Sequence, residues 1–474
     1  MDPRIIRSLP LLLLMLAAAL PVHPQYIHRV LEYVPAPGQH INTATGSPHA
    51  AGTVCGDSGG MVNLGAFGGY LVFRFEEPVY NDPDNPYGVD FTIFGNPLSE
   101  WSEPGIVSVM KDENGNGLPD DSWYELAGSD HHFSSTVSAY RVTYENPGQP
   151  GAADVPWYDN LNNTGYIYAN SYYKQAYYPS ADSFPSIDRD SYTLGGTMIK
   201  AVTDSDGTAG YRSYPRAFGY ADNRPRGEPP WDIPDNPYTR EVENSGGDAF
   251  DISWARDDGG NYADLDTVHF IRVHNAVLAD AGALGELSTE ITGAVDVSPA
   301  AGITGVRDMI VIKDLPPAID SPAYQLEVFV FHRGRPVEGR ELNWVCSMQS
   351  ADVDANNILS AASQGELTIT ASLADDPEIT ASASTLITSQ AVSVEHTGAA
   401  QDIILYPNPA TESIYLAGLK DAEIRVLNTA GKVLIKDQGY SGEKAISIRT
   451  LPAGIYIISI RSHSGIINKK LIKH

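Results

Sequence analysis

Short stretches in which apolar and polar residues alternate recur along the whole chain, and clusters of turn-forming residues separate them. Clear examples are GGYLVFRF (68–75), AYRVTYEN (139–146) and TVHFIRVHNAV (267–277). A period of two places successive side chains on opposite faces of a strand, and little helical periodicity competes with it. The 43 Gly and 33 Pro residues supply turns between the strands. This pattern predicts an all-β protein built from antiparallel sandwiches.

Length and charge narrow the class of protein further. The 474 residues are enough for about three domains. The 31 basic and 59 acidic residues give a net charge of −28, which excludes sequence-independent nucleic-acid binding. Two cysteines exclude a disulfide-dense scaffold and a four-cysteine zinc site. Because Cys55 and Cys346 fall in different predicted domains, we expect two isolated buried thiols rather than a bridge.

The first residues have the organisation of an export signal. Arg4 and Arg7 precede an apolar run from Leu9 to Leu20, and the small residues at 17–19, near the end of this run, mark a cleavage point. The run is too short for the roughly 20 residues that a membrane-spanning helix needs. Residues 1–24 are therefore predicted to be a cleaved signal peptide. We expect the mature protein not to be integral to the membrane, because no other run approaches that length.

The end of the chain differs in charge from the rest. Residues 402–474 contain 10 basic and 6 acidic residues, whereas residues 25–401 contain 19 basic and 52 acidic residues. Within 402–474 the alternation of apolar and polar residues continues, with turns at Asn-Thr-Ala-Gly and Leu-Pro-Ala-Gly. This asymmetry predicts a small C-terminal β-sandwich with a separate role.

Three strings in this tail occur in a recognisable order: YPNPATESIYL, then NTAGKV, then LPAGIYIISI before the Lys-rich end. Together they resemble the type A C-terminal sorting domain of the type IX secretion system of Bacteroidetes. The resemblance implies that the type IX secretion machinery carries the chain across the outer membrane. It also implies that the tail is then removed and the protein is attached to the outer cell surface or released. The positions that carry the motif are Tyr406, Pro407, Asn408, Pro409, Gly431, Leu451, Pro452, Gly454 and Tyr456.

Residues 318–390 are predicted to form another β unit, followed by a linker at 391–401. YQLEVFVFHRG and GELTITASLA alternate, and Trp344 lies where a buried aromatic residue would pack between two sheets. The string from ELNWVC to ASTLIT resembles a group 2 bacterial Ig-like domain. The resemblance implies an Ig-like β-sandwich that serves as a spacer or in adhesion.

Residues 25–315 form the largest predicted part, a jelly-roll-like β-sandwich with many loops. The strings GGYLVFRFEEPV, DFTIFGNP, SEPGIVSVMKDENGNGLPDDSWYELAGS and DTVHFIRVHNAV resemble a family of Bacteroidetes cell-surface proteins. Their strand pattern is similar to sandwich modules of the discoidin and carbohydrate-binding kind. The resemblance implies a surface location and a ligand-binding sandwich, without an activity.

The string GDSGG at residues 56–60 surrounds the nucleophilic serine in chymotrypsin-like proteases. In that family it follows a first barrel that supplies His and Asp, and no such barrel fits before Ser58. We therefore expect a turn before a strand rather than a protease site.

The string KDENGNGLPDDSWYE (111–125) is the strongest candidate for a metal site. Asp and Asn recur at every second position before a glycine, which curls side-chain oxygens toward one centre as Ca²⁺ prefers. An EF-hand would have Glu at the twelfth position, where this chain has Trp123. The alternative is a turn in which these side chains cap their own backbone. The candidate Ca²⁺ ligands are Asp112, Asn114, Asn116, Asp120 and Asp121.

Eight tyrosines lie between residues 158 and 192. Exposed rings stack on the apolar faces of sugars, so this region is a candidate glycan-binding surface. The alternative is that the tyrosines line a sandwich core with their hydroxyl groups at its rim. The candidate ligand-binding residues are Tyr172, Tyr173, Tyr177, Tyr178 and Trp231.

These observations predict an exported cell-surface protein that binds a glycan or similar extracellular ligand without catalysis. One alternative is a secreted polysaccharide-degrading enzyme that draws paired carboxylates from the acidic turns. Another is a surface protein that captures a nutrient. Two carboxylates converging in an aromatic cleft would favour the enzyme, and a shallow aromatic face without them would favour binding.

Overall fold

The computed structural model describes residues 25–57, 59–205, 211–244, 246–388, 403–417, 419, 422–428, 432–441, 444–462 and 465–474. The predicted signal peptide (1–24), Ser58, the predicted linker (391–401) and Gly431 lie outside the described residues. Nearly all regular structure in the described part is strand, which confirms the all-β prediction. The short helices are α1 (Pro48–Thr53), η1 (Pro86–Gly88), η2 (Ser129–His132), η3 (Ile252–Trp254) and η4 (Gly282–Leu284).

The chain forms two compact units. The first contains residues up to 318 together with 324–359 and 366–386, and the second contains 319–323, 360–365 and the residues from 387 onward. No helix in the described part of the chain combines the length and hydropathy that crossing a bilayer requires.

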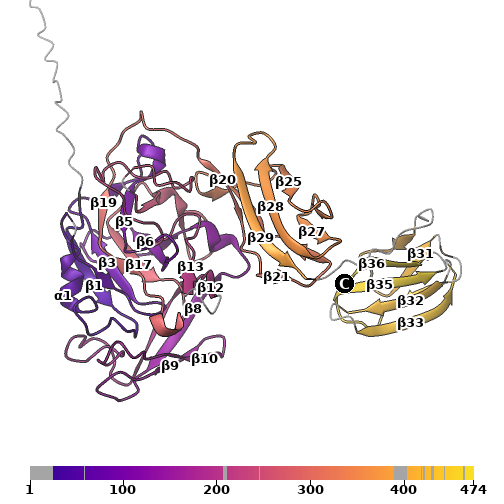
Figure 1. Ribbon diagram of the computed structural model, residues 1–474, viewed down its shortest axis with the longest axis horizontal. Coiled ribbons are helices and arrows are strands. Elements are labelled where there is room, and N and C mark those ends of the chain that lie inside the picture. The colour runs from indigo at the N-terminus through magenta and orange to yellow at the C-terminus, as the bar shows by residue number, and fades with distance from the viewer. Residues whose placement is uncertain are drawn as a thin grey trace, which may run out of the picture. The chain divides into compact units, whose positions relative to one another are not determined.

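An antiparallel sheet of six strands forms the centre of the N-terminal sandwich (Figure 1). In order, its strands are β1 (Arg29–Val34), β3 (Tyr70–Arg74), β17 (Phe270–Asn275), β6 (Gly105–Met110), β7 (Trp123–Leu126) and β15 (Ala255–Arg256). A three-stranded sheet of β14 (Asp248–Phe250), β5 (Phe91–Phe94) and β19 (Gly293–Asp296) packs against one face of it. Three two-stranded ladders complete this part: β12 (Thr203–Ser205) with β13 (Tyr211–Ser213), β16 (Thr267–Val268) with β4 (Val79–Tyr80), and β18 (Glu290–Ile291) with β2 (Val62–Asn63).

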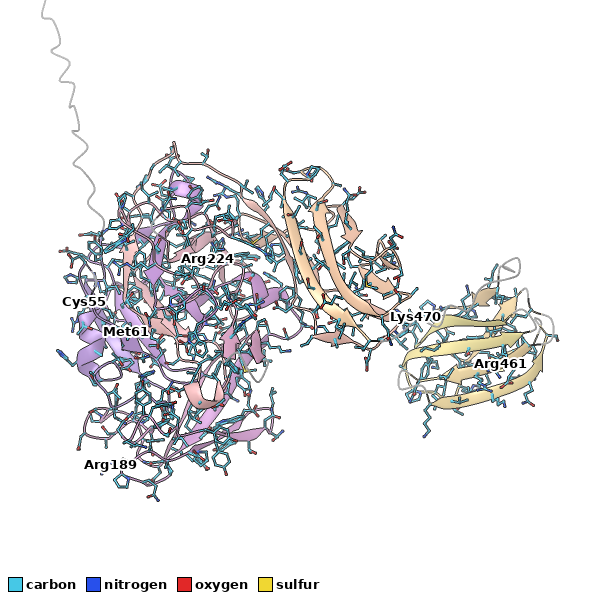
Figure 2. The ribbon with its side chains drawn as sticks, in the orientation of Figure 1. Cys55, Met61, Arg189, Arg224, Arg461 and Lys470 are labelled. Carbon is cyan, nitrogen blue, oxygen red and sulfur yellow. The ribbon has the colours of Figure 1, made fainter. Side chains whose placement is uncertain are left out.

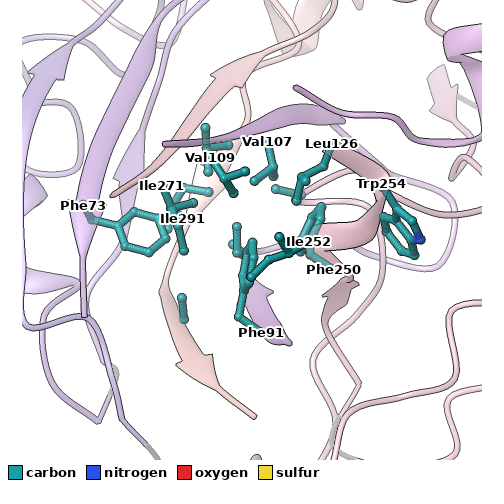
Figure 3. Close-up of a cluster of buried hydrophobic side chains, with 14 of the residues drawn as sticks. Phe73, Phe91, Val107, Val109, Leu126, Phe250, Ile252, Trp254, Ile271 and Ile291 are labelled. Atoms are coloured by element: carbon teal, nitrogen blue, oxygen red, sulfur yellow. The ribbon is translucent and has the colours of Figure 1, made fainter. Parts of the chain in front are cut away.

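The core lies between these two sheets (Figure 3). Phe73, Val107 and Ile271 from the six-stranded sheet contribute to the same buried cluster as Phe91 and Phe250 from the opposite sheet. Phe91 and Phe250 stack with ring centroids 5.3 Å apart. Burial of large apolar side chains from both sheets is the main stabilising contribution in such a sandwich.

The central strands are buried on both faces, so their burial does not alternate. All six residues of β6 and all four of β5 are buried. The second face of the six-stranded sheet packs against another sheet, made of β10 (Thr164–Ile167), β9 (Val155–Asp159), β8 (Val137–Glu145) and β11 (Ser191–Met198). Tyr140, Val142 and Tyr144 alternate along β8 into the core of that layer, as period two predicts.

The predicted Ig-like region contains three sheets. The first sheet contains β20 (Asp308–Ile312), β23 (Val328–His332) and β24 (Arg335–Pro336). The second contains β21 (Ala318–Ile319), β29 (Thr380–Ile387), β28 (Gly365–Leu373) and β25 (Leu342–Cys346). The third contains β22 (Ala323–Gln325), β27 (Ile358–Ala361) and β26 (Ala351–Val353). Trp344 is half-buried against the local core. Strand β20 pairs with β23 although it precedes the predicted boundary at residues 315–318.

The first of these sheets also shares a core with the N-terminal sandwich. Met309, Val311 and Phe331 belong to the same buried cluster as Phe250. The buried Trp254 indole donates a hydrogen bond of 3.1 Å to the carbonyl oxygen of Arg333. The two parts of the larger unit are therefore joined by apolar packing as well as by polar contacts.

The tail folds into two further sheets around its own core. These are β30 (Ile404–Tyr406), β31 (Ser413–Ala417) and β34 (Ile446–Ser447), and β33 (Val433–Tyr440), β32 (Ala422–Leu427), β35 (Gly454–Ser462) and β36 (Gly465–Lys473). Ile414, Val426 and Ile458 are among the residues buried between them. Cys55, labelled in Figure 2, and Cys346 are both unbridged and half-buried.

Candidate functional site

A groove of about 1020 Å³ lies on the second face of the six-stranded sheet. Its floor is formed by Tyr70 on β3 and by Arg272 and His274 on β17. Tyr70 and His274 occupy paired positions in the β3–β17 ladder, so their side chains lie on the same face. The floor therefore combines an aromatic ring, a guanidinium group and an imidazole on a rigid sheet.

The walls of the groove come from β1 and from the β8–β11 layer. Tyr158, which is 46% exposed, and the half-buried Tyr192 add aromatic rings. Thr143 and Thr193 add hydroxyl groups, which hydrogen-bond to each other at 2.7 Å. The remaining polar lining residues are Glu32, Ser186, Asp188 and Ser191.

The Arg272 guanidinium is the cation of the groove. It lies over the Trp123 ring, with 4.6 Å from its central carbon to the ring centroid. Its buried Nε has no hydrogen-bond partner among the described residues, and burial lowers the pKa of the group. The guanidinium remains charged because arginine retains its proton in proteins. Such a group favours a ligand that offers hydrogen-bond acceptors.

Beneath the groove, Glu125 is fixed by its neighbours. The Thr197 hydroxyl donates to its Oε2 at 2.6 Å, and His131 Nε2 lies 3.7 Å from the same oxygen. Burial opposes ionisation of Glu125, but the charge of His131 and the hydrogen bond from Thr197 outweigh it and lower its pKa to about 2. Burial also lowers the pKa of His274 to about 4, so this imidazole is neutral at pH 7.

The five predicted calcium ligands are brought together in one loop between β6 and β7. The Asp112 carboxylate accepts from the backbone N–H groups of Asn116 (3.1 Å) and Gly117 (2.8 Å). The Asn114 amide donates to Asp120 at 3.0 Å and to Asp121 at 3.2 Å. Asn114 and Asn116 hydrogen-bond to Asp120 and lower its pKa. The geometry fits both interpretations made from the sequence, a cation loop and a self-capped turn.

The predicted aromatic ligand residues do not form one surface. Tyr172 is 73% exposed, whereas Tyr177 and Tyr178 are 1% and 3% exposed and belong to the core beneath β8. Tyr173 packs edge-on against His40, with 4.9 Å between the ring centroids. Trp231 lies under Arg226, whose guanidinium carbon is 3.6 Å from its ring centroid. The prediction that Tyr177 and Tyr178 contact ligand is therefore corrected: both are core residues.

The aromatic residues that do line the groove were mostly missed. Tyr33 and Tyr70 lie far from the tyrosine-rich segment in sequence, and only the sheet brings them beside Tyr158 and Tyr192. In the sequence, Tyr70 is an ordinary position of the predicted strand at 68–75, and Tyr33 lies outside the predicted strands. Both residues lie on the second face of a sheet that is buried on both sides. This position can be predicted only when it is known which layers pack against that sheet.

A second cleft of about 920 Å³ also lies within the larger unit. Its most buried cation, Arg216, is already paired with Asp130 at 2.8 Å and with Asp314 at 2.6 Å. This cleft therefore offers a ligand less unsatisfied charge than the groove at Arg272 does.

In the tail, the sequence motif has a clear structural role. The Asn408 amide donates to the carbonyl oxygen of Lys470 at 2.7 Å, and its oxygen accepts from the backbone N–H of Ile472 at 2.8 Å. The side chain thereby fastens the first segment of the tail to its last strand, β36. Tyr406 stacks on Tyr415, with 5.6 Å between the ring centroids.

The other motif positions support the turn before β35. The Tyr456 hydroxyl donates to the carbonyl oxygen of Pro452 at 2.8 Å. Leu451 packs against the tail core, and Gly454 begins β35 with a φ of +157°. Gly431 lies outside the described residues. These contacts of Leu451, Pro452 and Tyr456 hold the turn that precedes β35.

Comparisons with known proteins agree with the prediction that the tail is a C-terminal sorting domain. Residues 404–474 match the family described as secretion system C-terminal sorting domain. No curated protein matches the chain.

Similar solved structures include dimeric latent PorU from Porphyromonas gingivalis, with 12% identity, a TM-score of 0.13, and coverage of 71% of this chain and 30% of that chain. They also include PorZ, a surface component of the type IX secretion system of the same organism, with 10% identity, a TM-score of 0.14, and coverage of 91% and 46%. Extracellular domains 3–5 of Drosophila OTK match with 12% identity, a TM-score of 0.13, and coverage of 43% and 81%. TM-scores this low do not indicate a common overall fold.

The family match covers the same segment in which the sequence motif, the separate core and the Asn408 clamp were found. Residues 404–474 are a C-terminal sorting domain of the type IX secretion system, and the protein is exported and attached to the cell surface.

Proposed function

We propose that the protein is a non-catalytic glycan-binding protein displayed on the cell surface, and that the groove on the second face of the six-stranded sheet holds the glycan. The observation that carries this proposal is the composition of the groove. Tyr33, Tyr70, Tyr158 and Tyr192 line it together with the Arg272 guanidinium.

These side chains complement an oligosaccharide. Aromatic rings pack against the C–H faces of sugars, and hydroxyl and guanidinium groups hydrogen-bond to sugar hydroxyls. A volume of about 1020 Å³ accommodates a short oligosaccharide rather than a single small ion. Since the protein is exported, extracellular glycans are the polymers it meets.

The groove is better suited to binding than to hydrolysis. A glycosidase needs a carboxylic acid with a raised pKa opposite a second carboxylate. Two backbone N–H groups, those of Asp190 (2.8 Å) and Ser191 (3.3 Å), hydrogen-bond to Asp188 in the groove wall and lower its pKa. Glu32 accepts a hydrogen bond of 3.2 Å from Tyr70. The groove therefore favours the binding hypothesis over the polysaccharide-degrading enzyme.

Calcium is the proposed cofactor of the 112–121 loop. Five oxygen-bearing side chains meet there, and Trp123 follows the loop directly. Because Trp123 supports the Arg272 guanidinium, an ion that orders the loop would also hold the groove floor in place. We therefore expect glycan binding to weaken when calcium is removed.

A glycan array, followed by calorimetry on the best glycan, tests the proposal. Tyr158→Ala should weaken binding about tenfold, the scale expected for losing one stacked ring. Tyr172→Ala is the matched control, because Tyr172 is more exposed and does not line the groove. Equal affinity of the Tyr158 variant and the wild type, or a stronger effect of Tyr172→Ala, would show that the groove does not hold the glycan. Release of shortened glycan would identify the enzyme instead.

A further inference from the structure

Three carboxylates meet in the interior of the N-terminal sandwich, outside the groove. One oxygen from each of Glu103, Asp222 and Glu290 lies within 4.8 Å of the others, and all three residues are buried. They come from the segment before β6, from the loop after Tyr220 and from the start of β18. The described neighbours that act on Asp222 and Glu290 through charge are themselves acidic, namely Asp248 and Glu286.

Such a cluster is costly unless something neutralises it. Burial raises the pKa of Glu103 to about 7 and raises those of Asp222 and Glu290 well above the usual range. Buried charges in proteins are normally paired or coordinate metals. Protons on the carboxyl groups are one solution, and a bound cation is the other.

The fixed positions of the carboxylates favour the cation. Asp222 Oδ1 accepts from the Asn96 backbone N–H at 2.7 Å, and its Oδ2 accepts from the Glu290 N–H at the same distance. Glu103 Oε1 accepts from the Ser288 N–H at 2.7 Å. Backbone N–H donors stabilise the ionised forms of the Asp222 and Glu103 carboxylates. The backbone therefore fixes the positions of the Asp222 and Glu103 carboxylates within the cluster.

A fourth group supplies independent evidence of a ligand. Asn63 is 1% exposed, its amide donates to the Glu290 carboxylate, and its Oδ1 has no hydrogen-bond partner among the described residues. An orphaned buried amide oxygen costs about 1–3 kcal/mol, so such groups are rare without a role. Rotation of the amide by 180° exchanges its nitrogen and oxygen and presents the oxygen to the carboxylate cluster.

Local backbone geometry restricts the position of the Asp222 carboxylate. Asp222 has a φ of +56°, which is unfavourable for a residue with a side chain. A Cβ atom on Gly95 would lie 2.2 Å from Asp222 Oδ1, so only glycine leaves room for the carboxylate there. Both features hold the Asp222 carboxylate in a single position, and the positive φ of Asp222 adds local backbone strain.

We propose that Glu103, Asp222 and Glu290, with the Asn63 amide oxygen, bind one hard divalent cation, calcium, in the interior of the sandwich. Carboxylate and amide oxygens are the ligands that calcium prefers, and six to eight of them surround the ion. The ion connects β2, the segment before β6, the Asp222 loop and β18. This site is distinct from the 112–121 loop and does not depend on the glycan-binding proposal.

Metal content is the first test. The variant Asp112→Ala/Asp121→Ala removes the loop as a calcium site, and its calcium is then measured by elemental analysis after gel filtration. One calcium ion per chain is the expected result. Adding Glu290→Gln should abolish it, while adding Glu113→Ala, which changes an exposed side chain that is a ligand in neither site, should leave it in place.

Terbium luminescence is the second test, and it does not depend on folding of the Glu290 variant. The Trp101 side chain lies close enough to Glu103 to favour its ionised form, so excitation of Trp101 should sensitise terbium bound at the cluster. In the loop-disabled protein, Trp101→Phe should remove this emission but leave the calcium content unchanged. Trp123→Phe, which removes the tryptophan beside the loop, should preserve it.

The proposal is overturned if the loop-disabled protein holds neither calcium nor terbium. It is also overturned if Glu290→Gln, folded by circular dichroism, keeps its calcium. In either case the three carboxyl groups are stabilised by protons alone.

Discussion

Asn63 and Glu290 occupy directly opposite positions in the β2–β18 ladder, and the amide of the first donates to the carboxylate of the second. The backbone carbonyl of Asn63 also accepts a hydrogen bond of 2.6 Å from the Tyr33 hydroxyl. Tyr33 lines the groove. The buried acidic cluster and the groove wall are thus connected through one residue, so ordering of β2 by an ion would also order the groove.

Two further buried carboxyl groups predict a pH dependence of stability. Burial raises the pKa values of Glu286 and Asp248 to about 8. Glu286 faces Glu103 and Asp280, and Asp248 faces Arg224 and Asp235. Between the unfolded and folded pKa values of an acid, the folded state binds more protons than the unfolded state. Stability contributed by these protons is complete below about pH 4 and is lost as the pH rises through about 8.

In a chelating buffer we therefore expect the free energy of unfolding to fall between pH 6.5 and 8. Each proton involved contributes a slope of about 1.4 kcal/mol per pH unit. Buried histidines such as His274 reduce this slope up to about pH 7.5, because their unfolded forms still bind protons there, so the wild type and a carboxyl variant are compared at the same pH values. Urea unfolding at half-unit intervals measures the slope. Glu286→Gln should make it shallower, and an unchanged slope would show that Glu286 is ionised in the folded state.

A glycine in the β23–β24 turn provides a packing test. Gly334 has a φ of +72°, and a Cβ atom there would lie 2.1 Å from the Trp254 Nε1. Gly334→Ala should therefore displace Trp254 and its hydrogen bond to Arg333, and we expect a loss of about 2–4 kcal/mol. Gly339→Ala is the control, since Gly339 has a similar φ of +77° but open space around it, and it should lose only about 1 kcal/mol. Equal losses in thermal unfolding would refute a role for the Trp254 contact.

In the tail, Asn408→Ala should weaken the closure of the first segment onto β36. The change removes hydrogen bonds of 2.7 and 2.8 Å, each with a net contribution of about 1 kcal/mol. We expect a tail that unfolds at lower temperature and a smaller fraction of protein at the cell surface, measured by surface labelling of the native host. Lys469→Ala, an exposed change in the same strand, should leave both unchanged. Normal display of the Asn408 variant would show that the clamp is dispensable for sorting.

Maturation at both ends is a separate prediction. Mass spectrometry of surface protein from the native host should show a start near residues 20–26 and the loss of most of residues 402–474. The basis is the export-signal pattern at one end and the sorting domain at the other. Surface-exposed protein that still ends at His474 would contradict removal of the tail.

Local patterns allowed much of this molecule to be predicted. The alternation in β8 and β28 is visible directly in the sequence, because one face of each strand is buried. The tail motif was also readable, because Asn408, Pro452 and Tyr456 act through neighbours at fixed positions. The five loop residues at 112–121 lie close together because a single tight turn joins them, and such a turn can be recognised from local spacing.

Contacts between residues that lie far apart in the sequence could not be predicted. Glu103, Asp222 and Glu290 are isolated acidic residues in the sequence, and only sheet topology joins them. The sequence left Tyr177 and Tyr178 as either ligand-binding or core residues, because tyrosines suit both places, and only the packing of their segment under β8 decides for the core. Period-two alternation gives the two faces of a strand, but it does not reveal which face a third layer covers.

The calcium loop gives the last prediction, which is tested at Asp112. The Asp112 carboxylate already holds the backbone N–H groups of Asn116 and Gly117, which places its oxygens at the centre of the loop. An ion bound only in the folded state stabilises it by about 2.7 kcal/mol at a free concentration 100 times Kd. Millimolar calcium should therefore raise the melting temperature by a few degrees.

Both candidate calcium sites contribute to that shift, so the comparison is made between variants. Asp112→Ala should remove the part that belongs to the loop, because losing one charged ligand weakens a site for a hard cation. Glu113 is the exposed neighbour of Asp112, and only its backbone N–H contributes to the loop. The Glu113→Ala variant should therefore keep the full shift in melting temperature. Magnesium should substitute poorly, because it requires a smaller octahedral shell. If the Asp112 variant shows the same calcium-dependent shift as the Glu113 variant, the loop is a self-capped turn and the ion binds elsewhere.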